Sequence, residues 1–322
     1  MTITRLEIDA ARIGVLCGGT SPERPGSLAS GQAATQALTD AGLKAEMIDL
    51  AEVPVTDLAG QIDLALLALH GLGGEDGKIQ GTLDTLGIPY TGSGVLASAL
   101  GMYKPTFKTL LKAHGIDTPA WTVLGAAQSV ASAVARVEQQ ISDWPIFFKP
   151  CSGGGSLVAG IAHDRADLES LLSAARSEPY EQYMVEEYID GMPCTVGVLE
   201  IDGDLTTLPV LGVETQRDFY DYEAKHDLSQ RTEHCPAPLP ATQLQEMRAT
   251  ALNVHRLLGA HGVSRVDFMA GEGRTAVLEI NTIPGLSVKG NLAAMSRAAG
   301  ISYPEMVRHV LRTATTKPAY VP

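Results

Sequence analysis

Two short apolar runs between residues 265 and 287 carry polar side chains whose types and spacing could bind a cation. The runs flank Gly271-Glu272-Gly273 and therefore predict a β-hairpin, in which side chains alternate between two faces. If the polar faces of the two strands coincide, three oxygen-bearing side chains converge: Asp267, Glu279 and Asn281.

The same alternation sorts the neighbours of these three residues. Arg265 and Met269 share a face with Asp267, and Val277 is expected on the face of the two polar residues of the second strand. Carboxylates among Val, Phe, Leu and Ile are costly to desolvate unless a cation compensates them. Hard oxygen ligands with no His or Cys nearby favour Mg²⁺, which proteins bind through few carboxylates plus substrate phosphates. The alternative is an ionic pair satisfied inside the sheet.

Length and composition predict a soluble protein of several domains. At 322 residues the chain exceeds the usual size of a single core, so we expect two or three domains. Hydrophobic residues make up 45% and charged residues 19%, and no apolar run is long enough to cross a bilayer. The start of the chain lacks a basic segment followed by an apolar core, so we expect a cytoplasmic protein.

The acidic balance argues against nucleic acid and anionic membranes as partners. The formal net charge is −13, from 37 acidic and 24 basic residues, and no long basic run is present. A phosphate ligand is compatible with this charge, because a few lysines and backbone amides suffice to bind one. The four cysteines are far apart and are predicted to be free thiols: Cys17, Cys151, Cys194 and Cys235.

The first part of the chain predicts a small open α/β domain. A buried strand over 12–17 is followed by a glycine turn and a helix near 27–40, and further strands are expected over 44–50 and 64–69. Open α/β sheets place ligands at the carboxyl ends of such strands. The glycine-rich, polar stretch over 70–81 is either part of a ligand site or a plain surface loop.

A second region begins near residue 96. One helical pattern runs from Leu96 to Leu111, and a strand over 145–150 contains Lys149, close to the glycine-rich segment 151–156. Glycines let backbone amides approach an anion and the lysine adds a positive charge, so the segment predicts a phosphate flap. The alternative is a flexible linker. The segment is not a P-loop, because Gly-Lys-Ser/Thr is missing.

The remaining pattern predicts further strands and one long loop. Strands are expected over 183–189, 195–201 and 206–214, and a helix over 241–259 leads into the hairpin. The polar, aromatic stretch over 216–236 is expected to be a lid or a disordered segment, as long polar loops in compact domains usually are.

Taken together, these motifs resemble the D-alanine–D-alanine ligase family. The matching stretches lie in order along nearly the whole chain: residues 18–24, 70–81, 91–94, 219–225 and the hairpin with Pro284-Gly285. The family has the ATP-grasp fold, an α/β (α+β) architecture that holds ATP between a central and a C-terminal domain. The resemblance implies an N-terminal open α/β substrate domain over 1–95, a central ATP-grasp domain over 96–189 and a C-terminal catalytic domain over 190–322.

The resemblance also implies a reaction, with ATP and Mg²⁺ as cofactors and small amino acids as substrates. ATP phosphorylates the carboxylate of one amino acid, and the amine of the second attacks the acyl phosphate to give an amide and ADP. Negative charge develops on the phosphoryl oxygens and on the tetrahedral centre, which explains why a metal ion, lysines and an arginine gather. A homodimer is a further expectation from the family.

Site roles follow from the resemblance, position by position. The metal ligands match Asp267, Glu279 and Asn281. The ATP-binding positions are Lys104, Lys149, Ser156, Glu186 and Lys225. The positions assigned to catalysis are Glu23, Lys225, Arg265 and Gly285. The residues expected to line the amino-acid site are Glu23, His70, His226, Arg265, Lys289 and Asn291. Glu75 is expected to orient Lys104 or a neighbouring group.

Departures from the family pattern fall on substrate residues. The family's flap usually reads Lys-Pro-x-x-Glu-Gly-Ser-Ser, and the serine that bonds the glutamate of the first substrate site is Gly155 here. The lid tyrosine expected after Glu-Ala-Lys is His226, so only Glu23 remains of a three-residue latch. Lys289-Gly290-Asn291 stands where His-Ser-Leu usually binds the second carboxylate, and Pro193 replaces the glutamate that holds the ribose.

Intact phosphate and metal residues beside altered substrate residues predict a changed substrate rather than lost catalysis. Gly155 leaves room for a first substrate larger than alanine, and Lys289 could pair with a carboxylate that lies differently from the family's. Two alternatives stay open. One is an ordinary D-alanine–D-alanine ligase of cell-wall synthesis, and the other is an inactive nucleotide-binding homologue.

Overall fold

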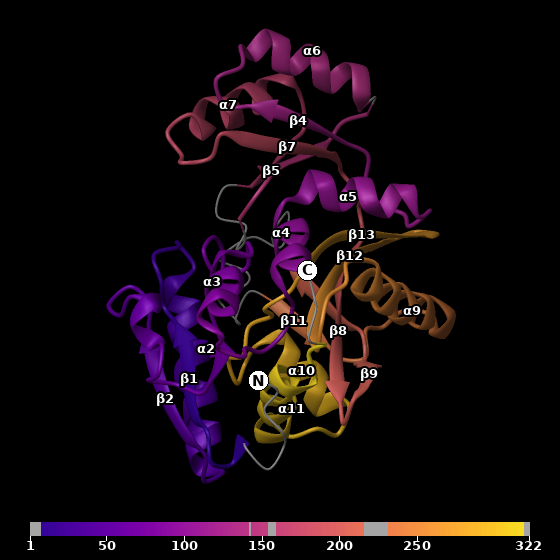
Figure 1. Ribbon diagram of the computed structural model, residues 1–322. Helices are drawn as coiled ribbons and strands as arrows, with labels where there is room; N and C mark the ends of the chain where they lie inside the picture. The colour runs from indigo at the N-terminus through magenta and orange to yellow at the C-terminus, as the bar shows by residue number, and fades with distance from the viewer. Residues whose placement is uncertain (1–7, 142, 154–158, 216–230, 319–322) are drawn as a thin grey trace.

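The computed structural model describes residues 8–141, 143–153, 159–215 and 231–318, which form three β-sheets flanked by helices (Figure 1). The middle part of the chain forms an upper lobe, and the N-terminal and C-terminal parts lie below it. Within the described ranges, no helix combines the length and the apolar character needed to cross a membrane.

The N-terminal sheet has three parallel strands in the order β2-β1-β3. Its strands are β1 (Arg12–Cys17), β2 (Lys44–Asp49) and β3 (Leu64–Leu67), and its helices are α2 (Arg24–Asp40), the 3₁₀ turn η1 (Val55–Leu58) and α3 (Lys78–Leu86). All four residues of β3 are buried, as expected for a strand covered on both faces. Because β1 and β3 are parallel, the polar loops that follow them lie at the same edge of the sheet. Helix α3 begins inside the glycine-rich stretch 70–81.

The central sheet is antiparallel, in the order β4-β7-β5-β6. Its strands are β4 (Trp121–Gly125), β5 (Ile146–Pro150), β6 (Gly160–Ala162) and β7 (Gln182–Glu187), and its helices are α6 (Val130–Gln140) and α7 (Arg165–Ala175). Phe148 and Tyr183 stack in the core with ring centroids 4.8 Å apart. Glu186 pairs with Phe147, so side-chain alternation places Glu186 and Lys149 together on the face away from this core.

The C-terminal sheet runs in the order β11-β10-β8-β12-β13, with β9 paired to β8. Its strands are β8 (Met192–Ile201), β9 (Asp204–Thr207), β10 (Leu211–Thr215), β11 (Arg231–His234), β12 (Val263–Gly271) and β13 (Arg274–Asn281). Its helices are α9 (Ala241–Leu257), α10 (Asn291–Ala298) and α11 (Tyr303–Thr316).

The predicted hairpin is present, and its polar faces do coincide. Strands β12 and β13 pair so that Asp267 lies opposite Glu279. The prediction for Val277 is wrong, because a bulge between Asp267 and Phe268 shifts the register and pairs Val277 with Phe268. Both of these side chains are buried in the core, 1% exposed. A β-bulge places one extra residue in a strand, and side chains beyond it point to the opposite face.

Two further elements differ from the prediction, and each difference is explained by a proline. The single helix expected from Leu96 to Leu111 is two helices, α4 (Val95–Met102) and α5 (Lys104–Ala113). Pro105 lies in the first turn of α5, where the missing N–H is tolerated, whereas inside one continuous helix it would break the hydrogen bonding. The strand expected over 206–214 is likewise divided into β9 and β10, on either side of Pro209.

The hydrophobic cores connect the ends of the chain. One core combines residues of β1 and β3 with residues of α10 and α11, so the N-terminal sheet packs against the C-terminal helices. Phe107 and Leu111 of α5 are buried with residues of β8 and β12. The division into 1–95, 96–189 and 190–322 stays a proposal, and α5 packs with the C-terminal sheet.

Candidate functional site

Side chains of the β12–β13 hairpin and of β8 hold the carboxylate of Asp267 in place. Arg265 donates to both oxygens of Asp267, from Nε at 2.9 Å and from Nη2 at 2.8 Å. Asn281 Nδ2 donates to Asp267 Oδ2 at 3.2 Å. Thr195 of β8 donates from Oγ1 to Asp267 Oδ1 at 2.6 Å. Asp267 is therefore held in a defined orientation, while its side chain stays 18% exposed.

Glu279, directly opposite Asp267, faces the lysine that begins α5. Lys104 Nζ lies 3.6 Å from Glu279 Oε2 and donates to the backbone carbonyl of Gly153 at 2.6 Å. The N–H of Gly153 contacts Met102 Sδ at 3.1 Å. Lys104 therefore links the hairpin to the first residues of the predicted phosphate flap.

A buried carboxylate lies between two lysines on the central sheet. Glu186 Oε2 is 2.5 Å from Lys149 Nζ, and Glu186 Oε1 accepts a hydrogen bond from Lys108 Nζ. Burial opposes ionisation of Glu186, but the charges of Lys108 and Lys149 hold its pKa below the ordinary value. Burial lowers the pKa of Lys108 to about 8, against the attraction of Glu186. At neutral pH this triad carries a net positive charge.

Acidic side chains of the hairpin also raise the pKa of Lys149. Burial acts to lower its pKa, but Glu186, then Glu279 and Asp267, raise it above the ordinary lysine value. The side chain of Lys149 is 11% exposed, so it is a desolvated cation close to acidic groups from two sheets. Such a cation is suited to hold an anionic ligand between those sheets.

Two glutamates of the N-terminal domain lie against one glycine. A Cβ placed on Gly71 would lie 2.7 Å from Glu23 Oε1, and Gly71 has a φ of +73°, so glycine is required here. The N–H of Gly71 donates to Glu75 Oε2 at 2.8 Å. Glu75 thus contacts its own loop, whereas Lys104 contacts Gly153 and Glu279. Burial, followed by the charge of Glu23, raises the pKa of Glu75 to about 8.

His70 and Gly285 meet where the N-terminal domain faces the loop after Asn281. A Cβ on Gly285 would lie 3.7 Å from His70 Nε2 and 3.9 Å from Ser30 Oγ. Burial, and then the positive charge of Arg265, lowers the pKa of His70 to about 4, so the imidazole is neutral at neutral pH. These contacts bring the predicted substrate residue His70 and the predicted catalytic residue Gly285 together.

The remaining predicted site residues either follow the hairpin in the chain or lie outside the described ranges. Lys289 is exposed on a turn before α10, and Asn291 is the first residue of that helix. The carbonyl of the neighbouring Val288 accepts a hydrogen bond from Arg297 Nη1 at 3.0 Å. Three predicted site residues lie outside the described residues: Ser156, Lys225 and His226. The same is true of Gly155 in the predicted phosphate flap.

Three side chains complete the arrangement without belonging to any predicted motif. Lys108 follows Lys104 by one helical turn, so its place on the same face of α5 could have been inferred from spacing. Thr195 pairs with Asp267 across β8 and β12, a register that no local pattern encodes. Ser30 contacts His70 from helix α2, which likewise depends on how distant elements pack.

The oxygen donors of the hairpin fit Mg²⁺. Asp267, Glu279 and Asn281 lie on one polar face and are partly accessible, and carboxylate and amide oxygens are ligands of hard cations. Within the described ranges no three His, Cys, Asp or Glu residues form a metal cluster. Two carboxylates and one amide do not fill the octahedral shell of Mg²⁺. Substrate phosphates and water usually supply the remaining ligands of Mg²⁺ in proteins.

Two protein-family models match the chain. The model described as D-ala D-ala ligase C-terminus matches residues 110–312, and that described as D-ala D-ala ligase N-terminus matches residues 50–93. A D-alanine–D-alanine ligase of Syntrophotalea carbinolica is 38% identical over 318 residues, which is 97% of this chain and 99% of that protein. One of Alcanivorax borkumensis is 41% identical over 303 residues, 93% of this chain and 92% of that protein.

Solved structures agree with these relatives. A D-alanine–D-alanine ligase from Bacillus anthracis complexed with ATP aligns with a TM-score of 0.79 at 31% identity, covering 94% of this chain and 97% of that chain. The VanG D-Ala:D-Ser ligase from Enterococcus faecalis aligns with a TM-score of 0.78 at 25% identity, covering 94% and 98%.

Proposed function

The chain belongs to the D-alanine–D-alanine ligase family, and we propose that it joins two molecules of D-alanine while converting ATP to ADP and phosphate. The predicted ATP-grasp fold, the ATP-dependent ligase class and its cofactors ATP and Mg²⁺ are confirmed by the family and the structural neighbours. One observation carries the proposal for this chain. The hairpin carboxylates of Glu279 and Asp267 act electrostatically on the buried Lys149 of the central sheet, and Lys104 lies 3.6 Å from Glu279.

We place the phosphates of ATP between the hairpin and the central sheet. Lys104 and Lys149 would contact the phosphate oxygens, and Glu186 would hold Lys149 in place. The family resemblance puts Glu186 at the pocket for the adenine of ATP, which we call the proposed adenine pocket. Mg²⁺ bound by Asp267, Glu279 and Asn281 would supply charge neutralisation for the phosphoryl group being transferred. The roles of Ser156 and Lys225 in binding ATP remain part of this proposal.

The amino acids would lie between the N-terminal domain and the loop that carries Gly285. Glu23 would receive the ammonium group of the first D-alanine, whose carboxylate oxygen attacks the γ-phosphorus and displaces ADP. The amine of the second D-alanine then attacks the carbonyl carbon, expels phosphate and loses a proton, which forms the amide bond. Arg265, oriented by Asp267, would stabilise the oxyanion of the tetrahedral intermediate.

The identity of the substrates is the finer part of the proposal. Relatives named D-alanine–D-alanine ligase at 38% to 41% identity favour D-alanine for both positions. The departures at Gly155, His226 and Lys289 are the observations that favour a changed substrate. Lys289 is exposed, so a role in binding a carboxylate would require it to reach the ligand from the surface.

A product assay separates these two candidates. The protein is incubated with Mg-ATP and a panel of D-amino acids, L-amino acids and hydroxy acids, and phosphate release and product mass are recorded. We expect D-alanine alone to give the dominant dipeptide, and Asp267→Asn to retain the fold but lose turnover by more than a hundredfold. A dominant product with another amino or hydroxy acid would replace the D-alanine assignment by the changed substrate.

The setting of the enzyme is a further part of the proposal. A cytoplasmic location fits an enzyme that consumes ATP, and the proposed partners are small amino acids rather than nucleic acid or membrane. The homodimer is a proposal from family membership, and sedimentation of the purified protein would measure it.

A further inference from the structure

The hydroxyl of Ser30 connects three parts of the proposed substrate site. Ser30 lies in helix α2 and is 1% exposed. Its Oγ is 3.1 Å from His70 Nε2, and it accepts a hydrogen bond from the backbone N–H of Leu286 at 3.2 Å. One buried atom of helix α2 therefore contacts both the imidazole of His70 and the loop that follows Asn281.

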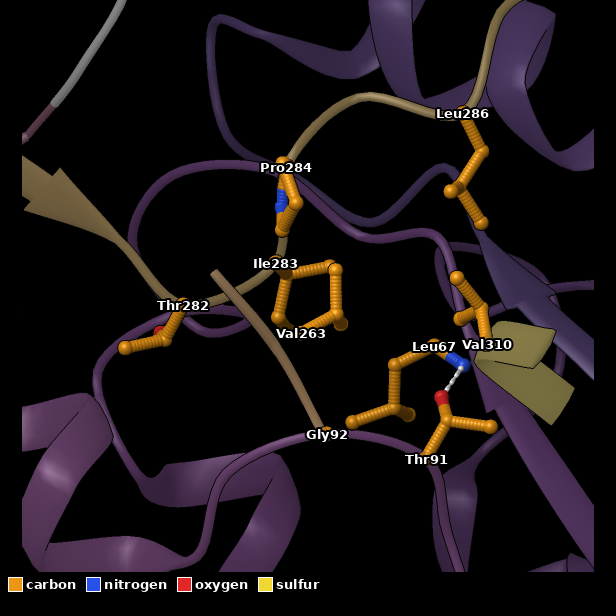
Figure 2. A pocket seen from close by; sticks show the side chains of 9 residues that line it. All are labelled: Leu67, Thr91, Gly92, Val263, Thr282, Ile283, Pro284, Leu286 and Val310. Carbon is orange, nitrogen blue, oxygen red and sulfur yellow. Dashed lines mark hydrogen bonds between the residues drawn. The ribbon is translucent and has the colours of Figure 1, made fainter. Parts of the chain in front are cut away.

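The same loop is held from its other side. The hydroxyl of Tyr303, in helix α11, donates to the carbonyl of Leu286 at 2.7 Å, so both polar groups flanking this residue are bound by side chains. Behind the loop lies a small apolar cavity, shown in Figure 2, whose lining includes Pro284, Val263 and Val310.

Hydrogen-bond accounting assigns the proton on the His70 ring. A serine hydroxyl has one hydrogen to donate, and a neutral imidazole has one donor and one acceptor nitrogen. The Ser30 hydroxyl already accepts from the Leu286 N–H, and within the described ranges His70 Nε2 is the one acceptor in hydrogen-bond reach of its own hydrogen. The hydroxyl therefore donates to Nε2, which leaves the single proton of the neutral ring on Nδ1.

We propose that Ser30 is a positioning residue, whose O–H donates to His70 Nε2, fixes the Nδ1–H tautomer and joins the ring to the Leu286 peptide. The ring then lines the amino-acid site in a fixed orientation, because its acceptor nitrogen Nε2 is already hydrogen-bonded to Ser30. The inference rests on the proposed function only where it concerns D-alanine binding. The tautomer and the link to Leu286 are properties of the protein without substrate.

The test combines ¹⁵N NMR of the histidine rings with steady-state kinetics. The wild-type protein should show His70 as a neutral ring with Nδ1 protonated. In Ser30→Ala we expect a mixture of tautomers and a five- to tenfold higher KM for D-alanine, with kcat changed less than twofold. Binding of ATP, measured by calorimetry, should stay unchanged.

Two matched variants separate positioning from general destabilisation. Ser27 is also buried on α2, where it accepts from Gly18 N–H at 2.8 Å and donates to the carbonyl of Ala68 at 2.7 Å. Ser27→Ala should lower the melting temperature about as much as Ser30→Ala but leave the His70 spectrum unchanged. Tyr303→Phe should raise KM for D-alanine and also leave the His70 tautomer unchanged, because it removes only the contact to the loop.

The wild-type spectrum decides the proposal even if a variant fails to fold. A wild-type His70 ring protonated on Nε2, or charged at neutral pH, would overturn the assignment. An unchanged KM and an unchanged spectrum in folded Ser30→Ala would do so as well. If the protein shows no ligase activity but the spectrum matches, the proposed function fails while the structural link stands.

Discussion

Glu75 has a pKa far above that of a free glutamate. It lies 7% exposed beside Gly71, and burial, followed by the charge of Glu23, raises its pKa to about 8. The N–H of Gly71 and the charge of Arg265 act in the opposite direction and are outweighed. At neutral pH Glu75 is therefore largely a neutral carboxylic acid in the folded protein.

Stability should consequently fall as pH rises. Between pH 4.5 and 8 the folded protein binds this proton more tightly than the unfolded chain does, so the free energy of unfolding declines over that window. Glu75→Gln removes the titration and should flatten the decline by a few kcal/mol, on the order expected for such a shift. Urea unfolding at several pH values measures this, and parallel pH profiles for both proteins would contradict the assignment.

The acidic and amide groups of the site could be predicted from local sequence, and their partners could not. Asp267, Glu279 and Asn281 stand out because strand alternation needs only neighbouring residues. Thr195 and Ser30 are ordinary hydroxyl residues, and what they contact depends on pairing and packing between elements far apart in the chain. The same limit applies to Glu75, whose neighbours are known only once the loop has folded.

At the scale of elements, the start of β13 is joined to the central sheet by ion pairs. Arg274 donates to Asp117 from Nε at 2.7 Å and to Glu187 from Nη1 at 2.6 Å. Glu187 also accepts from the N–H of Ala120 at 3.2 Å. Because Glu187 follows Glu186 directly in β7, these bonds fix the end of the strand at the proposed adenine pocket.

Loss of this arginine should weaken nucleotide binding more than it weakens the fold. Arg274→Ala should raise the dissociation constant of a non-hydrolysable ATP analogue about three- to tenfold, because the end of β7 loses a partner. The three side chains are 35% to 47% exposed, so we expect a stability loss of only about 1 kcal/mol. Arg165→Ala, which breaks the exposed pair with Glu138, is the control. Equal nucleotide affinity in all three proteins would show that the ion pairs do not position the strand.

Most elements could be predicted from periodicity and turn residues, and the exceptions have physical causes. Strand β1 has the predicted bounds, Arg12–Cys17, because a buried strand followed by two glycines is a strong local signal. The break between α4 and α5 was also signalled, since Pro105 cannot lie inside a continuous helix. The bulge after Asp267 carried no such signal, because it depends on how β12 pairs with β13.

At the scale of the whole molecule, the proposed site draws on segments that meet only after folding. The hairpin would supply the oxygen ligands, the central sheet would supply Lys149 and Glu186, and the loops after β1 and β3 would supply Glu23 and His70. The shared core of β1, β3, α10 and α11 holds the N-terminal sheet against the C-terminal helices. The family resemblance could predict this assembly, whereas composition and periodicity could not.

The most direct test of the central claim follows the oxygen atoms of the substrate. The protein is incubated with Mg-ATP and D-alanine labelled with ¹⁸O in its carboxylate, and the products are examined by mass spectrometry. We predict ADP, a dipeptide, and inorganic phosphate that carries one ¹⁸O atom, because the activated carboxylate leaves one oxygen on phosphate when the amide forms. Dipeptide formed with unlabelled phosphate, or with the label in AMP, would contradict activation through an acyl phosphate.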